Sequence, residues 1–476
     1  MSEEIEWRKL DNSAKIFPIS AGKKYSTVFR YSAVLYDNID EKILVQAVDN
    51  SLNKFKYFRM KLRKGFFWHY LEYNDNNAII EEESDYPCEY VDPQECNDYL
   101  FRISYYKNKV NVDYYHALTD GNSALEFFKE IIYQYIELKN PKDFKELSRN
   151  KDFLKYEFDA SDDFIKNYDI KNKERNRNNE LAYVIKGTRL PINKIATIHE
   201  YINSNKLKKK AKDYNATITQ YLSAVLIYAI YKSNMDKEKI DKRPIKLCIP
   251  VNLRRYFQSK TIANFFSYFS VVAHIGKDNL DSFDKILDLV KNEFENKLTK
   301  EEIIKTMSAN VKIGINPIIR HIPLPFKVLL VRIGYSIIRK YTTITFSNVG
   351  RFGILKDYQK YIDHVLMMIA PEPIERIKTT AISFNNTTAV SFTTNIYNAD
   401  IELEFKRILE EHGLTVDAES NNVIKIQSEN KMNLIKTPYP DKINNNKHYV
   451  HLEKRQEMFR KKHENIIEII RKRFNS

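Results

Sequence analysis

The chain has 476 residues, of which 43% are hydrophobic and 29% charged. This length exceeds the usual size of one hydrophobic core, so we expect a globular protein with two lobes. The formal net charge of +14 raises the question of nucleic-acid binding, but residues 420–476 hold 13 Lys or Arg and 6 Asp or Glu, a net +7. Half of the excess therefore lies in a terminal tail. The sequence has no short nucleic-acid motif and no basic stripe interleaved with aromatics, so no nucleic-acid partner is expected.

Targeting and metal-binding signals are weak throughout the chain. Residues 1–7 are acidic and contain no apolar run, which argues against a secretory signal. The longest apolar stretch, residues 221–231, has about half the length needed to span a bilayer. Cys88, Cys96 and Cys248 are too few and too irregularly spaced for a disulfide framework or a zinc site. We expect a soluble, cytoplasmic protein without a metal.

The first part of the chain, residues 15–170, has the pattern of a mixed α/β unit. Regular apolar spacing predicts helices, and segments rich in Tyr, Val and Ile predict strands. The expected helices are residues 41–54 and 122–138, and the expected strands are residues 100–106 and 110–115, joined by a turn at 107–109. Residues 170–180 have almost no apolar side chains, which is typical of a linker.

A second α/β unit is predicted for residues 181–415. The expected strands are residues 181–186, 246–251, 265–275, 342–346, 381–384 and 389–394. The expected helices are residues 192–213, 217–233, 281–298 and 400–412. Because both units mix strands with helices, the expected fold class is a two-lobed α/β protein with mixed sheets.

The tail at residues 420–476 differs in character from both units. Within it, residues 449–474 predict a basic helix with isoleucines and Phe474 on its apolar side. Such a helix usually packs on its own domain. Self-association and contact with an anionic membrane are the alternatives.

The stretch from His116 to Gly121 carries the strongest chemical signal in the sequence. His116 follows an expected strand, and Asp120 and Gly121 come four and five residues later, at the start of an expected helix. A tight strand-to-helix turn can aim one side chain into a cavity while the flanking elements hold it rigidly. His116 is therefore the candidate base.

These residues resemble the HxxxDG motif of the chloramphenicol acetyltransferase-like superfamily. That superfamily includes alcohol acetyltransferases, wax ester synthases and the condensation domains of nonribosomal peptide synthetases. Further segments resemble the superfamily in the same order, namely residues 52–64, 207–222, 250–255 ("P-V-N-x-R") and 346–350 ("S-N-x-G"). The resemblance covers roughly residues 15–414 and implies two lobes with an active-site tunnel between them.

Two departures from the superfamily patterns favour one branch. Tyr115 stands where condensation domains usually carry a second histidine, and the D-F-G-W-G segment of the plant-type branch is absent from the sequence. The chain most resembles the stand-alone alcohol acetyltransferases. A stand-alone condensation-type enzyme with a carrier-protein donor and a non-catalytic binding module of the same fold are the alternatives.

The resemblance also implies roles for individual residues. His116 would be the general base for direct attack of an acceptor on a thioester, with no acyl-enzyme. Asp120 would hold the turn by pairing with an arginine, for which Arg254 is the first candidate and Arg255 the second. Gly121 would allow a backbone geometry or a close approach that a side chain obstructs.

Other implied features concern the oxyanion and the substrates. Asn252 belongs to the segment that resembles "P-V-N-x-R" and would support the site. Ser347 and Asn348 are candidate oxyanion donors, although the same residues fit a simple turn at the end of a strand. The expected donor is acetyl-CoA or another acyl-CoA, used as a co-substrate rather than a bound cofactor, and the acceptor is a small alcohol or amine.

Overall fold

The computed structural model describes residues 6–22, 25–84, 86–144, 159–169, 180–233, 242–421 and 434–436. Almost all of the expected linker at 170–180 and the whole expected helix at 449–474 lie outside the described residues.

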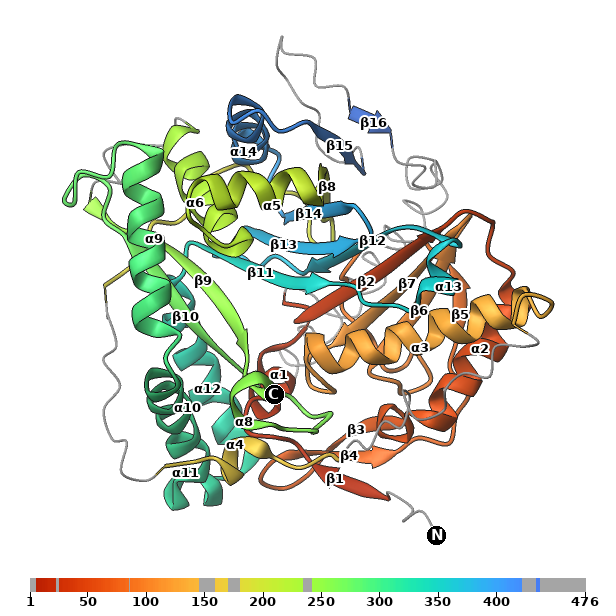
Figure 1. The fold of residues 1–476 in the computed structure, drawn as a ribbon. Coiled ribbons are helices and arrows are strands. Elements are labelled where there is room, and N and C mark those ends of the chain that lie inside the picture. Colours follow the sequence, from red (N-terminus) through yellow and green to blue (C-terminus); the bar gives the residue numbers. More distant parts are fainter. Residues whose placement is uncertain are drawn as a thin grey trace, which may run out of the picture.

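One body of the fold is a five-stranded sheet in the order β12-β2-β7-β6-β5. Its strands are β12 (Ile362–Ile369), β2 (Val28–Leu35), β7 (Lys109–Tyr115), β6 (Phe101–Tyr106) and β5 (Ile80–Glu82). The helices α2 (Glu41–Lys54) and α3 (Gly121–Lys139) pack on each other, and α3 runs along this sheet (Figure 1). Both helices begin at an aspartate that accepts two backbone N–H groups, Asp40 and Asp120, as expected for an N-cap.

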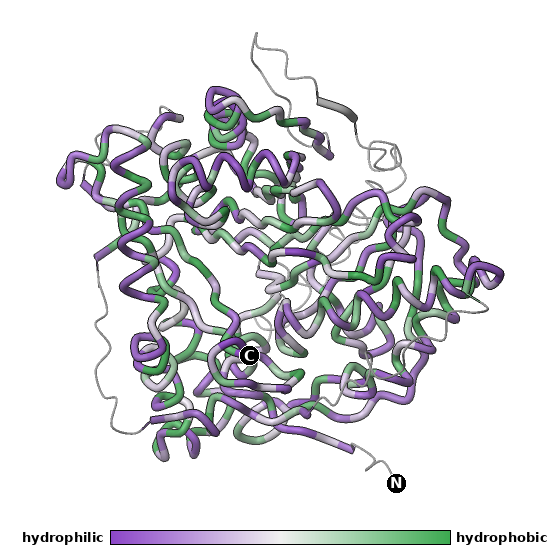
Figure 2. Tube along the Cα trace, viewed as in Figure 1, coloured by the Kyte–Doolittle hydropathy of each residue, from purple (hydrophilic) through white to green (hydrophobic). Residues whose placement is uncertain are grey.

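A second body is an eight-stranded sheet in the order β10-β9-β11-β13-β14-β8-β15-β16. Its strands are β10 (Phe266–Ala273), β9 (Ile245–Asn252), β11 (Ile344–Arg351), β13 (Ile377–Phe384), β14 (Thr387–Thr394), β8 (Ala196–Asn203), β15 (Val416–Ser420) and β16 (Leu434–Lys436). The helices beside it are α5 (Ser204–Asp213), α6 (Ile218–Lys232), α9 (Phe283–Lys297) and α14 (Asp400–Glu411). Figure 2 shows hydrophilic and hydrophobic residues alternating along α9 and α3, as expected for helices with one buried face.

Each sheet has its own hydrophobic core. The two sheets contact each other at strand β12. One core forms around β2, β7, α2 and α3, and the other around α6, β9 and β14. Strand β12, from the second half of the chain, pairs with β2 and also contacts β13 of the larger sheet. The division into residues 15–170 and 181–415 stays a prediction, and the second of these ranges supplies one strand to the first body.

Smaller elements surround the two bodies. A three-stranded sheet joins β1 (Trp7–Lys9), β4 (His69–Tyr73) and β3 (Met60–Lys64). The short helices are η1 (Ala14–Ile16), α1 (Phe17–Ser20), η2 (Lys56–Phe58), α4 (Asp163–Lys166), α8 (Arg254–Phe257), η4 (Arg339–Tyr341) and α13 (Lys356–Gln359). The helices α10 (Lys300–Ile315), α11 (Pro317–His321) and α12 (Leu324–Ile338) follow one another beside β10 and α1 (Figure 1). None of the helices within the described ranges is long and apolar enough to cross a membrane.

Three expected elements differ from the structure. The helix expected at 192–213 is wrong in its first half, because residues Ala196–Asn203 form β8 between β14 and β15. Both faces of β8 are covered, so its apolar residues do not alternate regularly. The sequence pattern therefore does not distinguish a strand from a helix at this place. The strand expected at 181–186 is not formed. The strand expected at 342–346 extends to Arg351, so Ser347 and Asn348 lie inside β11 rather than in a turn after it.

Candidate active site

The turn between β7 and α3 presents His116 at the end of a strand. β7 ends at Tyr115, and the backbone N–H of His116 donates to the carbonyl of Thr27 at 3.1 Å. Asp120 then caps α3, because its Oδ1 accepts the backbone N–H groups of Asn122 and Ser123, each at 3.1 Å. The base candidate therefore lies on a short turn whose two ends are fixed by a strand and a capped helix.

The second oxygen of Asp120 binds the other half of the chain. Oδ2 accepts Nη1 of Arg254 at 2.7 Å and the backbone N–H of Phe265 at 2.8 Å. Both side chains of this ion pair are almost completely buried. The four contacts of Asp120 are to backbone N–H groups and to Arg254, and this arrangement favours a supporting role over a catalytic triad.

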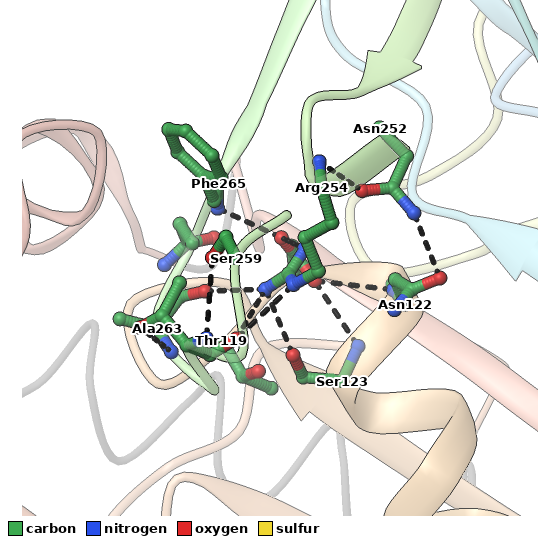
Figure 3. A network of polar contacts seen from close by, with 12 residues as sticks. Thr119, Asn122, Ser123, Asn252, Arg254, Ser259, Ala263 and Phe265 are labelled. Carbon is green, nitrogen blue, oxygen red and sulfur yellow. Dashed lines mark hydrogen bonds and ion pairs between the residues drawn. The ribbon is translucent and has the colours of Figure 1, made fainter. Parts of the chain in front are cut away.

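Arg254 extends this support to the segment that precedes β10. Its Nη2 donates to the hydroxyl of Ser123 at 2.9 Å and to the carbonyl of Ala263 at 2.7 Å. Nε and Nη2 both donate to the carbonyl of Thr261, at 3.1 and 2.9 Å. Figure 3 shows the guanidinium group between Ser123 of α3 and Ala263. One cation thereby joins the start of α3 to residues 261–263.

Two further polar contacts connect the same segments. The hydroxyl of Thr119 donates to the carbonyl of Ile262 at 2.8 Å. Asn252 donates from Nδ2 to Oδ1 of Asn122 at 2.9 Å and accepts the backbone N–H of Arg254 at 3.0 Å (Figure 3). Asn252 therefore fixes the backbone that carries Arg254, and the turn after β7 is held against residues 261–265 at several points.

Asn264, in the middle of that segment, contacts the imidazole of His116. Its Oδ1 lies 2.9 Å from Nδ1 of His116. Its Nδ2 donates to the carboxylate of Asp11 at 3.0 Å and to the carbonyl of His116 at 3.2 Å. Both of these groups are acceptors, so the amide nitrogen must face them and the amide oxygen must face the ring. Nδ1 therefore carries the ring hydrogen, and Nε2 has the free lone pair.

The surroundings of His116 favour the neutral imidazole. Phe17 stacks on the ring at a centroid distance of 4.6 Å, and Phe29 and Phe266 lie at 5.0 and 5.3 Å. Burial lowers the pKa of His116 below its usual value, and the charge of Asp120 and the hydrogen bond to Asn264 oppose this shift only in part. At neutral pH the ring is thus uncharged and able to accept a proton.

Nε2 of His116 is available for chemistry. Within the described residues it has no hydrogen-bond partner, and it is not among the fully buried polar atoms that lack one. The side chain as a whole is half-buried. A small molecule can therefore approach this nitrogen while Nδ1 remains bonded to Asn264.

Sequence reasoning did not find Asn264 or Asp11, although both support the base. Asn264 is completely buried, and Asp11 accepts three N–H groups, from Asn264 twice and from the backbone of Ala14. Asp11 lies before the part of the chain that carries the resemblance. The available signal was the aspartate three residues ahead of a short helix, which marks a local cap and gives no hint of a contact more than 250 residues away.

The other expected site residues lie in different surroundings. Asn348 donates to the hydroxyl of Thr219 at 3.0 Å and accepts the N–H of Gly350 at 2.9 Å, and no contact in the described residues joins Asn348 or Ser347 to His116. Gly121 lies where its carbonyl accepts the hydroxyl of Tyr31 at 2.8 Å, and a Cβ there would come within 3.3 Å of that hydroxyl oxygen. The glycine therefore permits a close approach and does not adopt an unusual backbone angle.

No group of three or more His, Cys, Asp or Glu in the described ranges is arranged to hold a metal ion.

Comparison with known proteins identifies the fold. Residues 183–362 match the family model described as alcohol acetyltransferase, a range that contains Arg254 and Asn264 but not His116. Among solved structures, trichothecene 15-O-acetyltransferase from Fusarium sporotrichioides aligns with a TM-score of 0.55 and 9% identity, covering 86% of this chain and 96% of that one. The chain has the two-lobed chloramphenicol acetyltransferase-like fold. The resemblance read from the sequence is thus confirmed at the level of the fold.

Two further structures show the breadth of this likeness. The TRI101 protein of F. sporotrichioides, solved with coenzyme A and T-2, aligns with a TM-score of 0.54 and 7% identity over 86% of this chain and 98% of that one. The first condensation domain of the CDA synthetase aligns with a TM-score of 0.54 and 10% identity over 85% of this chain and 96% of that one. No curated protein matches by sequence.

Replacing Arg254 with Ala should destabilise the protein strongly, because it leaves the buried Asp120 carboxylate without its counter-charge. We expect the free energy of unfolding to fall by about 3 kcal/mol. The matched control is Arg255→Ala, which removes the exposed arginine next to it and should change the value by about 0.5 kcal/mol or less. Chemical denaturation of the three proteins measures both differences. Equal effects of the two substitutions would show that Arg254 does not hold the site together.

Proposed function

We propose that the protein is an acyltransferase that moves an acyl group, with acetyl as the expected one, from acyl-CoA to an alcohol. The observation that carries this proposal is the neutral imidazole of His116, whose Nδ1 is bonded to Asn264 while Nε2 is accessible and has no hydrogen-bond partner among the described residues. A general base for acyl transfer needs this state at neutral pH.

In the proposed reaction, Nε2 removes the proton of the acceptor hydroxyl while its oxygen attacks the thioester carbonyl. The tetrahedral intermediate then collapses, the carbon–sulfur bond breaks, and the coenzyme leaves as a thiolate. The protonated His116 returns its proton to that sulfur, so the base is regenerated and the products are an ester and a thiol. Throughout, the oxygen of Asn264 accepts the Nδ1 hydrogen and supports the transient positive charge.

The tetrahedral intermediate carries an oxyanion, which needs a hydrogen-bond donor beside it. Asn348 donates one amide N–H to Thr219 and accepts the N–H of Gly350 with its oxygen, so its side chain is held in place and keeps a second N–H. The hydroxyl of Ser347, a half-buried residue of the same strand, has no hydrogen-bond partner among the described residues. Both Ser347 and Asn348 therefore stay as proposed oxyanion donors.

The nature of the donor and acceptor rests on the relatives. The alcohol acetyltransferase family model favours a hydroxyl acceptor. A structure of the same fold was solved with coenzyme A and T-2, which favours acyl-CoA as the donor. The likeness to a condensation domain supports the second candidate, a carrier-protein-bound donor that forms an ester or an amide. Release of free thiol from acyl-CoA, compared with transfer from an acylated carrier protein, distinguishes the two.

Replacing His116 with Ala should abolish acyl transfer while leaving the fold intact. We expect the turnover number to fall by about 10²–10⁴-fold, the usual contribution of a general base. Thiol release from acetyl-CoA with a panel of alcohols and amines measures the loss, and thermal unfolding checks the fold. His274→Ala is the control, because His274 is also half-buried and hydrogen-bonded but lies away from the site. A His116→Ala enzyme with near-native turnover would rule out His116 as the base, whereas a native chain that releases no thiol with any donor would favour the carrier-protein or binding-module alternative.

The pH dependence should report the pKa of His116 and its link to Asn264. Because burial lowers this pKa, kcat/KM should be constant above neutral pH and decline only at pH values below about 6.5, the ordinary histidine value. The hydrogen bond to Asn264 supports the protonated ring, so Asn264→Ala should shift the acid limb to lower pH. The plateau should also fall by about 10²-fold or less, because the tautomer is no longer fixed. An acid limb that stays in place would show that Asn264 does not act through the imidazole.

A further inference from the structure

Helix α12 exposes an apolar stripe to the outside of the protein. Five of its side chains, each between 50% and 64% exposed, make up this stripe: Phe326, Leu329, Leu330, Ile333 and Ile337. Their spacing of three or four residues places them on one side of the helix. Leu324, on the opposite side, is completely buried. The helix thus packs on the body through one face and presents a second apolar face that no described residue covers.

Two neighbouring elements extend this stripe. Ile318 of α11 is 77% exposed, and Phe66, in the turn between β3 and β4, is 72% exposed. The turn is fixed to α12, because the N–H of Leu324 donates to the carbonyl of Phe66 at 2.9 Å and Nζ of Lys327 donates to the carbonyl of Phe67 at 3.0 Å. We call Phe66, Ile318 and the five α12 side chains the apolar face.

The chain segment that holds α11 and α12 carries charge of one sign. Between Ile303 and Lys356 the sequence contains nine Lys or Arg and no Asp or Glu. Of these, Lys312, Arg320, Arg332 and Lys340 are exposed on or beside α11 and α12. An apolar helix face flanked by basic side chains suits a bilayer interface with anionic headgroups, where the apolar side chains enter the acyl boundary and the cations contact phosphates.

We propose that the apolar face docks the protein on an anionic lipid surface. Two other groups could cover this face, the tail at 420–476 and a second copy of the chain, and charge argues against both. The tail at 420–476 has a net charge of +7, so its approach would bring like charges together. A two-fold dimer through this face would likewise place the basic rim of one copy against that of the other. Since no described helix can cross a bilayer, the contact is peripheral.

Docking on this face brings the bilayer close to the element that packs on the base. Nε of Arg332 in α12 donates to the carbonyl of Ile19 in α1 at 3.2 Å. Phe17, in the same short helix α1, stacks on the imidazole of His116. Only α1 separates the apolar face from His116 along this chain of contacts. The docking itself does not depend on the proposed function, so its test needs no measurement of activity.

The test is co-sedimentation of the full chain with vesicles of phosphatidylcholine, with and without phosphatidylglycerol. We expect binding to the anionic vesicles, weakened by salt. Leu330→Glu should reduce the vesicle affinity by about 10-fold or more, since burial of one leucine contributes about 1.5–3 kcal/mol. The control is Ile192→Glu, because Ile192 is 59% exposed and Leu330 57%. Ile333→Glu provides a second variant, and thermal unfolding checks each fold.

Several results would overturn this proposal. Failure of the full chain to bind anionic vesicles is one of them. If Leu330→Glu and Ile192→Glu bind as the native chain does, the basic tail alone is responsible for attachment. A dimer that Leu330→Glu converts to a monomer in light scattering, without vesicle binding, would assign the face to a second copy. A crosslink from position 330 to the tail, without vesicle binding, would assign it to the tail.

Discussion

The ion pair between Asp120 and Arg254 is the interaction on which the rest of the site depends. Asp120 caps α3 with one oxygen and binds Arg254 and the backbone of Phe265 with the other. Arg254 in turn holds the carbonyls of Thr261 and Ala263. Residues from the two halves of the chain are thereby fixed in register, and Asn264 lies between the points of attachment. A carboxylate that would be costly to bury alone is stabilised here because all of its lone pairs are used.

The chemistry of His116 follows from that fixed register. Asn264 can bond to Nδ1 only because its own amide nitrogen is held by Asp11 and by the carbonyl of His116. This selects one tautomer, and the surrounding phenylalanines lower the pKa, so that Nε2 is a neutral acceptor. The charged groups therefore orient the imidazole through a neutral amide, while the charges of Asp120 and Asp11 partly oppose the lowering of its pKa, and the base does not pair with a carboxylate of its own.

The sequence predicted the local parts of this arrangement well. His116 at a strand end and the helix after Gly121 are present because hydrophobic periodicity gives a local signal, and the contact of Asp120 with Arg254, 134 residues away, was expected from the family resemblance alone. Asn264 and Asp11 gave no such signal, because their role arises from contacts between residues far apart in the chain. The same limit explains β8, whose strand character comes from the neighbours that cover both of its faces.

The central claim is that Asn264 fixes His116 as a neutral imidazole with its hydrogen on Nδ1. Nitrogen NMR of the full chain labelled in histidine, with the His116 signals assigned by comparison with His116→Ala, tests this claim directly. At neutral pH we expect one protonated nitrogen, Nδ1, one unprotonated nitrogen, Nε2, and a pKa below the ordinary value of about 6.5. A ring that is charged at neutral pH, or one with its hydrogen on Nε2, would contradict the account.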